Sequence, residues 1–130
     1  MKKVKILITW RFLIEDIKKY SSIFKKYNID YQIFKTDQYV KEAELLKVIH
    51  KYDGIICGDD KISKKVLDKT KKLRVISKWG TGIDSIDKNY AIKKNIKIFN
   101  TPGAFTSAVA EHALGLMFSL TRNITFNHVD

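Results

Sequence analysis

Five short apolar runs, separated by longer amphipathic stretches, most strongly constrain how this chain can fold. Each run is nearly continuous in apolar residues and does not alternate between apolar and polar ones. The runs cover residues 4–9, 31–34, 54–57, 73–77 and 96–99. A continuous apolar run is typical of a strand in a parallel sheet whose two faces are both covered.

The stretches between the runs carry apolar residues at helical spacing. The predicted helices cover residues 12–27, 41–51, 62–72 and 87–95. In the first of them, the apolar positions are Phe12, Ile17, Tyr20 and Phe24. Strand and helix therefore alternate five times, and right-handed crossovers would wind them into an open sheet. We predict an α/β fold, a flavodoxin-like doubly wound five-stranded parallel sheet with strand order 2-1-3-4-5.

Residues 106–124 form the longest predicted helix, with Thr106 or Ser107 as its N-cap and Glu111 in its early turns. Its apolar residues extend most of the way round the helix: Val109, Ala110, Ala113, Leu114, Leu116, Met117, Phe118, Leu120 and Ile124. A helix that is apolar all round is normally buried all round. We therefore expect a flavodoxin-like domain at residues 1–105 and a connecting helix at residues 106–130 that something else covers.

Charge and cysteine usage narrow the possible partners and compartment. The net charge is +11, but lysines recur singly or in pairs along the predicted helices and only three arginines occur. This pattern is typical of solvated helix faces, so we predict no nucleic-acid partner. No apolar segment reaches the roughly 18 residues of a membrane span, so we predict no membrane partner. Cys57 is the only cysteine, which excludes an internal disulfide and favours the cytoplasm.

The most informative local feature is the glycine loop, which we define as Gly80, Thr81 and Gly82. It follows the fourth predicted strand directly, and ligands bind at the carboxyl edge of such a sheet. The Gly-x-Gly spacing resembles the start of a dinucleotide fingerprint, but Ser85 stands where the third glycine belongs. Two glycines still allow close backbone approach, and the loop amides suit a carboxylate as well as a phosphate. The loop is a poor fingerprint and a good candidate anion site.

The other candidate catalytic or metal-binding residues give weaker indications of function. Glu111 and His112 are adjacent on a predicted helix, so their side chains do not face each other. Cys57 ends a predicted strand and is expected to be a small buried residue, not a nucleophile. Asp59 and Asp60 follow it in a cleft-side loop, where they could act as acid–base groups or cation ligands, although adjacent acids in a loop are usually solvated. No histidine or cysteine cluster has metal-ligand spacing, so we predict no metal site.

Residues 73–124 resemble the N-terminal substrate domain of the NAD-dependent, D-isomer-specific 2-hydroxyacid dehydrogenases. The resemblance rests on three motifs in matching order and spacing: GTGID at 80–84, NTPG at 100–103 and AVAEHALGL at 108–116. Among the members of that family, the segment is most similar to phosphoglycerate dehydrogenase. Residues 1–72 agree with the family only in their strand and helix pattern.

The resemblance implies specific roles for the matching positions. The backbone amides of Thr81 and Gly82 would hold the substrate carboxylate, Gly80 and Gly82 would shape the loop, and Thr81 would also lie near the nicotinamide of NAD. Residues 100–103 would border the cleft, and the helix from Thr106 would lead to a cofactor domain that binds most of the NAD. The family's arginine and its histidine–glutamate pair would lie in and after that domain. The resemblance therefore assigns no catalytic residue to this chain and implies that it is inactive alone.

Two positions depart from the family pattern and affect the expected pocket. Trp79 stands where the family often carries a smaller residue, and Ser85 replaces a common asparagine. Trp10 and Trp79 could equally well wall the cleft or pack in the core.

Three functions are compatible with these features. The first, which we favour, is the substrate-binding part of an NAD-dependent oxidoreductase that interconverts a D-2-hydroxy acid and its 2-oxo acid. The second is a small carboxylate-binding module that lacks catalysis. The third is a flavodoxin-like interaction domain whose exposed helical face pairs with a second copy or with a partner. A stable homodimer through residues 106–124 would then become monomeric in Leu116→Asp.

Overall fold

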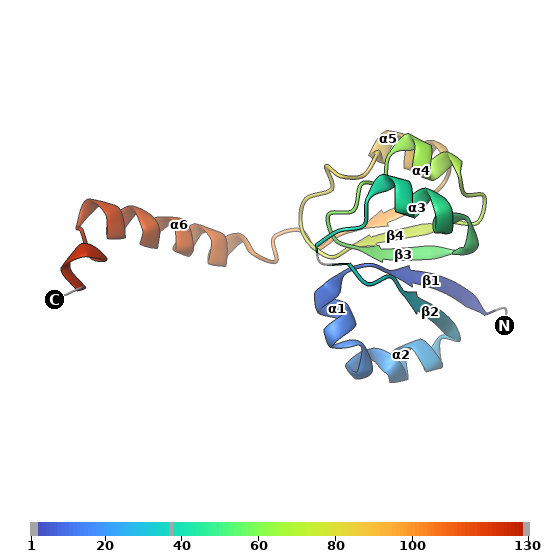
Figure 1. Ribbon diagram of the computed structural model, residues 1–130, viewed down its shortest axis with the longest axis horizontal. Coiled ribbons are helices and arrows are strands. Elements are labelled where there is room, and N and C mark those ends of the chain that lie inside the picture. The colour runs from blue at the N-terminus through green and yellow to red at the C-terminus, as the bar shows by residue number, and fades with distance from the viewer. Residues whose placement is uncertain (1–2, 37, 129–130) are drawn as a thin grey trace.

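The computed structural model describes residues 3–36 and 38–128, and its centre is one fully parallel five-stranded sheet (Figure 1). The strands are β1 (Val4–Ile8), β2 (Ile29–Ile33), β3 (Gly54–Cys57), β4 (Val75–Lys78) and β5 (Lys97–Phe99). Their order is β2-β1-β3-β4-β5. The predicted fold class and strand order are therefore confirmed.

Short helices cover both faces of this sheet, as Figure 1 shows. One face carries α3 (Glu42–Val48), α4 (Lys64–Asp68) and α5 (Lys88–Lys93). The other face carries α1 (Arg11–Glu15) and α2 (Ser21–Lys26), which lie beside β1 and β2. The 3-10 turns are η1 (Ile17–Tyr20), η2 (Ile49–Lys51) and η3 (Phe126–His128).

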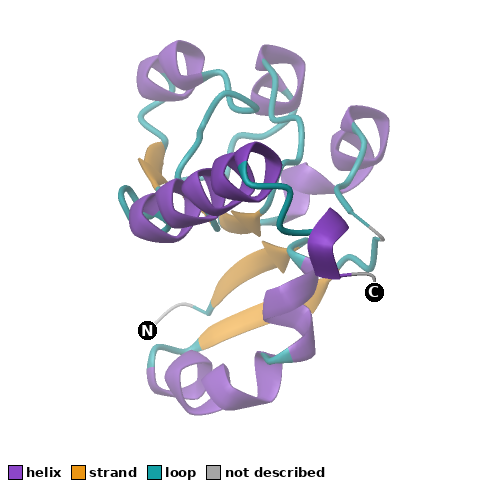
Figure 2. Cartoon of the chain, turned by 90° about the vertical axis from the view of Figure 1, so that its left-hand side faces the viewer, coloured by secondary structure: helices purple, strands orange, loops and turns teal. Residues whose placement is uncertain are grey.

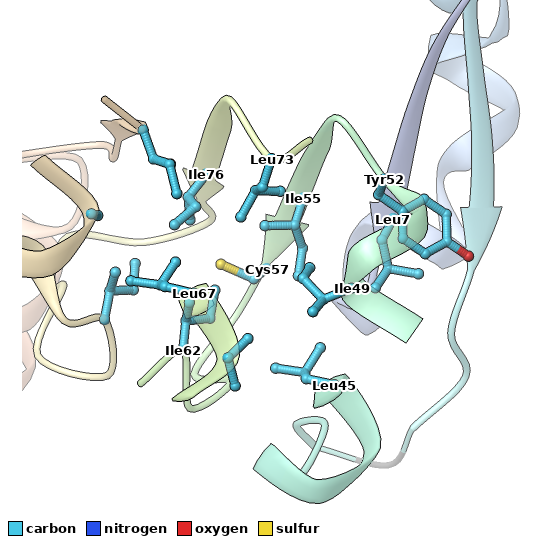
Figure 3. Close-up of a cluster of buried hydrophobic side chains, with 14 of the residues drawn as sticks. Leu7, Leu45, Ile49, Tyr52, Ile55, Cys57, Ile62, Leu67, Leu73 and Ile76 are labelled. Carbon is cyan, nitrogen blue, oxygen red and sulfur yellow. The ribbon is translucent and has the colours of Figure 1, made fainter. Parts of the chain in front are cut away.

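The core explains why the strands are apolar without alternation. Leu7 and Ile55 point into the larger cluster, where they meet Leu45 of α3 and Leu67 of α4 (Figure 3). Neighbouring strand residues point to the opposite face, where Ile8 is buried in a second cluster with α1 and α2. Since both faces of β1 are covered, successive residues along it are buried.

The segment predicted as one helix over residues 12–27 is broken into three pieces. Asp16 between α1 and η1 has φ −97° and ψ 7°, which is outside helical geometry. The break turns the chain so that Leu13 and Phe24 both reach the sheet. Phe12, one of the apolar positions at helical spacing, is half-exposed. The helical period of the sequence therefore does not hold across the break at Asp16.

The helix predicted over residues 62–72 is shorter than expected, and α4 covers only Lys64–Asp68, because a tertiary contact occupies one end and a local turn the other. Ile62 forms an isolated parallel bridge with Ile86. At the other end, the Thr70 hydroxyl accepts hydrogen bonds from the amides of Lys72 and Leu73. Residues bound in this way cannot continue the helical hydrogen-bond ladder.

The longest helix, α6 (Thr106–Thr121), extends away from the sheet in Figure 1 and lies in front of it in Figure 2. None of its residues is buried, and Leu120 is 75% exposed. Its N-cap is Phe105 and not Thr106 or Ser107, because the Thr106 amide already bonds the Gly103 carbonyl in the preceding turn. The helix ends at Thr121, short of the predicted end at residue 124, and Asn123 just beyond it takes a left-handed conformation. No helix among the described residues is both long and apolar enough to cross a membrane.

Candidate functional site

The glycine loop leaves the carboxyl end of β4 and lies beside the loop that leaves β5. The Thr101 amide donates to the Gly80 carbonyl at 3.0 Å, and Asn100 Nδ2 donates to the Thr81 carbonyl at 2.7 Å. The Thr81 hydroxyl donates to the Thr101 carbonyl at 3.1 Å. These bonds bring together two of the three sequence motifs and hold the loop in place.

The two glycines of the loop differ in what their backbone and surroundings demand. Gly80 has φ +143°, a conformation that side chains rarely adopt. Gly82 has no such backbone requirement, and a Cβ atom there would meet only Asp84 Oδ2, at 3.4 Å. Gly80 is therefore fixed by the backbone, whereas Gly82 leaves open space in front of the loop.

The backbone amides of Thr81 and Gly82 have no partner within the described part of the chain. Thr81 and Gly82 are both exposed. Within residues 3–36 and 38–128, their N–H groups donate to no protein acceptor. Two neighbouring donors at a strand end form a suitable concavity for an anion.

Gly58, which directly follows β3, contacts side chains from neighbouring strand ends near the glycine loop. The Gly58 amide donates to Asp60 Oδ2 at 3.1 Å, and its carbonyl accepts from Lys78 Nζ at 2.6 Å. A Cβ atom at Gly58 would lie 2.0 Å from Cε3 of Trp10. Gly58 therefore joins the ends of β1, β3 and β4. Its place directly after the third apolar run puts Gly58 in a loop at the predicted ligand edge of the sheet, but no local pattern predicts its contacts with the ends of two other strands.

Asp60 is buried, which corrects the expectation that both loop acids are solvated. It is 1% exposed and accepts from the Thr9 hydroxyl at 2.5 Å and the Val40 amide at 2.5 Å, in addition to Gly58. Three donors compensate the desolvation of its carboxylate. Asp59 is exposed, as expected.

Lys78 is the second unexpected buried charge at the site. It is 5% exposed, and its ammonium bonds the Gly58 carbonyl and the Asp59 carboxylate. Its Cε atom would lie 3.8 Å from a Cβ atom at Gly80. The Lys78 side chain thus passes close to the glycine loop, while its ammonium is neutralised by the Asp59 carboxylate.

Cys57 is fully buried, in agreement with the prediction that it is not a nucleophile. Burial, followed by the neighbouring Asp60 carboxylate, raises the pKa of its thiol to about 12. A thiol with that pKa carries almost no thiolate at neutral pH, and the thiolate is the reactive form.

The two tryptophans divide between the two predicted environments. Trp10 packs partly against the cluster of α1 and α2 and covers Gly58, whereas Trp79 is 39% exposed beside the glycine loop. Glu111 and His112 are both exposed on α6. In the part of the chain that the structure describes, no group of three or more His, Cys, Asp or Glu side chains could hold a metal ion.

Comparisons with known proteins identify the family of this chain. A family model described as D-isomer specific 2-hydroxyacid dehydrogenase, catalytic domain, matches residues 12–130. Hydroxypyruvate reductase of Thermotoga maritima is 37% identical over 90 residues, which are 68% of this chain and 29% of that protein. D-3-phosphoglycerate dehydrogenase of Methanocaldococcus jannaschii is 39% identical over 84 residues, 64% of this chain and 16% of that protein. Glyoxylate reductase of Thermococcus litoralis is 32% identical over 123 residues, 94% of this chain and 36% of that protein.

Solved structures share the fold. The NAD+-bound 3-phosphoglycerate dehydrogenase of Entamoeba histolytica has a TM-score of 0.76 and 27% identity, and the match covers 91% of this chain and 39% of that one. The NAD-dependent formate dehydrogenase of Staphylococcus aureus has a TM-score of 0.78 at 21% identity, and this match covers 95% and 40%. The chain therefore spans less than half the length of each of these proteins.

Proposed function

This chain belongs to the D-isomer specific 2-hydroxyacid dehydrogenase family, and we propose that it is the substrate-binding part of an NAD-dependent enzyme that interconverts a D-2-hydroxy acid and its 2-oxo acid. The observation that carries the proposal is the pair of exposed, unpartnered amides at Thr81 and Gly82. They lie at the carboxyl end of β4, the edge of a parallel sheet where ligands bind.

In this proposal, the chain binds and orients the substrate. The Thr81 and Gly82 amides donate to the substrate carboxylate. Because hydrogen bonds from Asn100 and Thr101 hold the glycine loop in place, its two amide donors are positioned before the substrate binds. A carboxylate that is anchored in this way presents its 2-carbon in one orientation, which lowers the entropic part of the barrier.

The hydride for the reduction would be supplied by NADH, held mainly by a cofactor domain. On this chain, Thr81 fits a contact with the nicotinamide end. Its exposed hydroxyl donates to Thr101 and retains acceptor lone pairs for an amide group. The proton-transfer groups would come from outside this chain, which would therefore be inactive alone. A single buried, protonated cysteine is compatible with the cytoplasm as the site of this activity.

The proposal is tested by separating binding from turnover. We expect hydroxypyruvate or glyoxylate, added to the 130-residue chain, to shift the NMR signals of the Thr81 and Gly82 amides, while acetamide, which has no carboxylate, leaves them unmoved. The natural protein purified from its own cells should oxidise NADH with the same acids, and the 130-residue chain should not. Carboxylate binding with no turnover by the natural protein would favour a binding module, and the absence of amide shifts would remove the loop from the site.

We further propose that α6 is a connecting helix, with the cofactor domain packed on its apolar side chains. The alternative is a homodimer through residues 106–124. One 16-residue helix paired with its copy offers little area compared with the roughly 1,200 Å² of a stable interface. We therefore expect the 130-residue chain and its Leu116→Asp variant to sediment with the mass of one copy. A dimer that Leu116→Asp dissociates would support the homodimer instead.

A further inference from the structure

The ion pair between Lys78 and Asp59 lies beside the glycine loop, and its two ends differ in exposure. Cys57 of β3 pairs with Lys78 of β4, so the residues that follow these two strands, among them Asp59 and Gly80, leave the sheet side by side. The Lys78 side chain is 4% exposed, whereas the Asp59 side chain is 76% exposed. The pair therefore presents its carboxylate to solvent at the ligand edge of the sheet and keeps its ammonium beneath.

The ammonium of Lys78 has little capacity left for a ligand. It donates to the Gly58 carbonyl at 2.6 Å and to the Asp59 carboxylate, which use two of the three N–H groups of a lysine. Its burial leaves the third N–H group almost no access to solvent. A negatively charged group that approached from the cleft would therefore meet Asp59 before it could reach Lys78.

Two further carboxylates lie near this ion pair. Asp60 Oδ2 accepts from the amide of Gly58, the residue whose carbonyl Lys78 binds. Asp84 is exposed, and its Oδ2 atom would lie 3.4 Å from a Cβ atom at Gly82. Three carboxylates and one ammonium thus lie around the loop, although the chain as a whole carries a net charge of +11.

We propose that Asp59 is a specificity-determining residue, and that the substrate is a 2-oxo acid whose only negative charge is the carboxylate held by the glycine loop. A second anionic group on the substrate, either a carboxylate or a phosphate, would meet the exposed Asp59 carboxylate and find the nearby ammonium already neutralised. Such a repulsive contact selects between substrates by weakening the binding of only one of them. This inference rests on the proposed function, because it requires a substrate carboxylate at the Thr81 and Gly82 amides.

The test compares 2-oxopentanoate with 2-oxoglutarate, two acids of equal chain length that differ in a terminal methyl or carboxylate. In the natural protein, we expect kcat/KM to be higher for 2-oxopentanoate, and Asp59→Asn to shift the ratio of the two values about tenfold toward 2-oxoglutarate. Asparagine keeps an oxygen acceptor for Lys78 while it removes the repelling charge. In the 130-residue chain, the ratio of the two Kd values, measured from the NMR shifts of the Thr81 and Gly82 amides, should change in the same direction.

Two variants separate the charge of Asp59 from its structural role. Asp59→Glu, which keeps the negative charge, should keep the preference for 2-oxopentanoate. Asp30→Asn is the matched control, because Asp30 also pairs with a lysine, Lys3, at 3.5 Å, but lies near the start of β2; it should leave the ratio unchanged.

The outcomes distinguish this inference from the proposed function. If 2-oxopentanoate shifts the loop amides but the unchanged protein uses both acids equally, or Asp59→Asn leaves the ratio unaltered, the role of Asp59 is overturned and the proposed function stands. If neither acid shifts the Thr81 and Gly82 amides, the proposed function fails and this inference fails with it.

Discussion

Gly58→Ala is expected to lower the free energy of unfolding by about 3 kcal/mol, the upper part of the range for overpacking a filled interior. The added methyl would lie 2.0 Å from Cε3 and 2.4 Å from Cζ3 of Trp10. The indole must therefore move as a whole, and the strand ends that Gly58 joins must separate. Urea unfolding followed by circular dichroism measures the change without relying on tryptophan fluorescence.

A double-mutant comparison identifies Trp10 as the cause. In a Trp10→Leu background, the same Gly58→Ala change should cost less than about 1 kcal/mol, because the clashing ring is gone. Gly115→Ala is the matched control, since nothing lies within 4 Å of a Cβ atom there. We expect that change to stabilise α6 by about 0.5–1 kcal/mol. An equal cost of Gly58→Ala in both backgrounds would show that the contact with Trp10 is not what excludes alanine.

The parts of the fold that the sequence predicted depend on local pattern. Continuous apolar runs identified all five strands, and the strand order expected for a flavodoxin-like fold is the observed one. The glycine loop was found for the same reason, because a strand end and two glycines are adjacent in the chain. Its partners Asn100 and Thr101 could be placed nearby only because the ends of β4 and β5 meet at one edge.

The parts that were missed depend on contacts between distant segments. Asp60 is buried because Thr9 and Val40 supply donors from other elements, and no local pattern distinguishes it from exposed Asp59. Lys78 is buried for a similar reason, since its ammonium reaches the carbonyl of Gly58 on the neighbouring strand. Hydrophobic periodicity predicts burial from the polarity of each side chain alone. It therefore cannot identify a charged side chain that is buried because its hydrogen bonds are satisfied.

Gly82→Val in the natural protein is expected to raise the KM for a 2-oxo acid roughly 10- to 100-fold, the range for losing a hydrogen bond to a charged group. The backbone of Gly82 is not in the left-handed region, and the nearest atom to a Cβ there is Asp84 Oδ2 at 3.4 Å. Valine can therefore be accommodated by the fold, while its methyl groups fill the space in front of the loop amides. The effect should fall on KM more than on kcat, because the anchoring contact is present before and during reaction.

Graded variants separate blocked access from general disruption. Gly82→Ala should raise KM less than Gly82→Val, since one methyl leaves part of the approach open. Lys25→Ala, at an exposed position of α2 on the other side of the domain, is the control and should leave KM unchanged. In the 130-residue chain, Gly82→Val should also abolish the carboxylate-induced shift of the Thr81 amide, a readout that needs no cofactor domain. An unchanged KM and an unchanged shift in Gly82→Val would place the substrate carboxylate elsewhere on the domain.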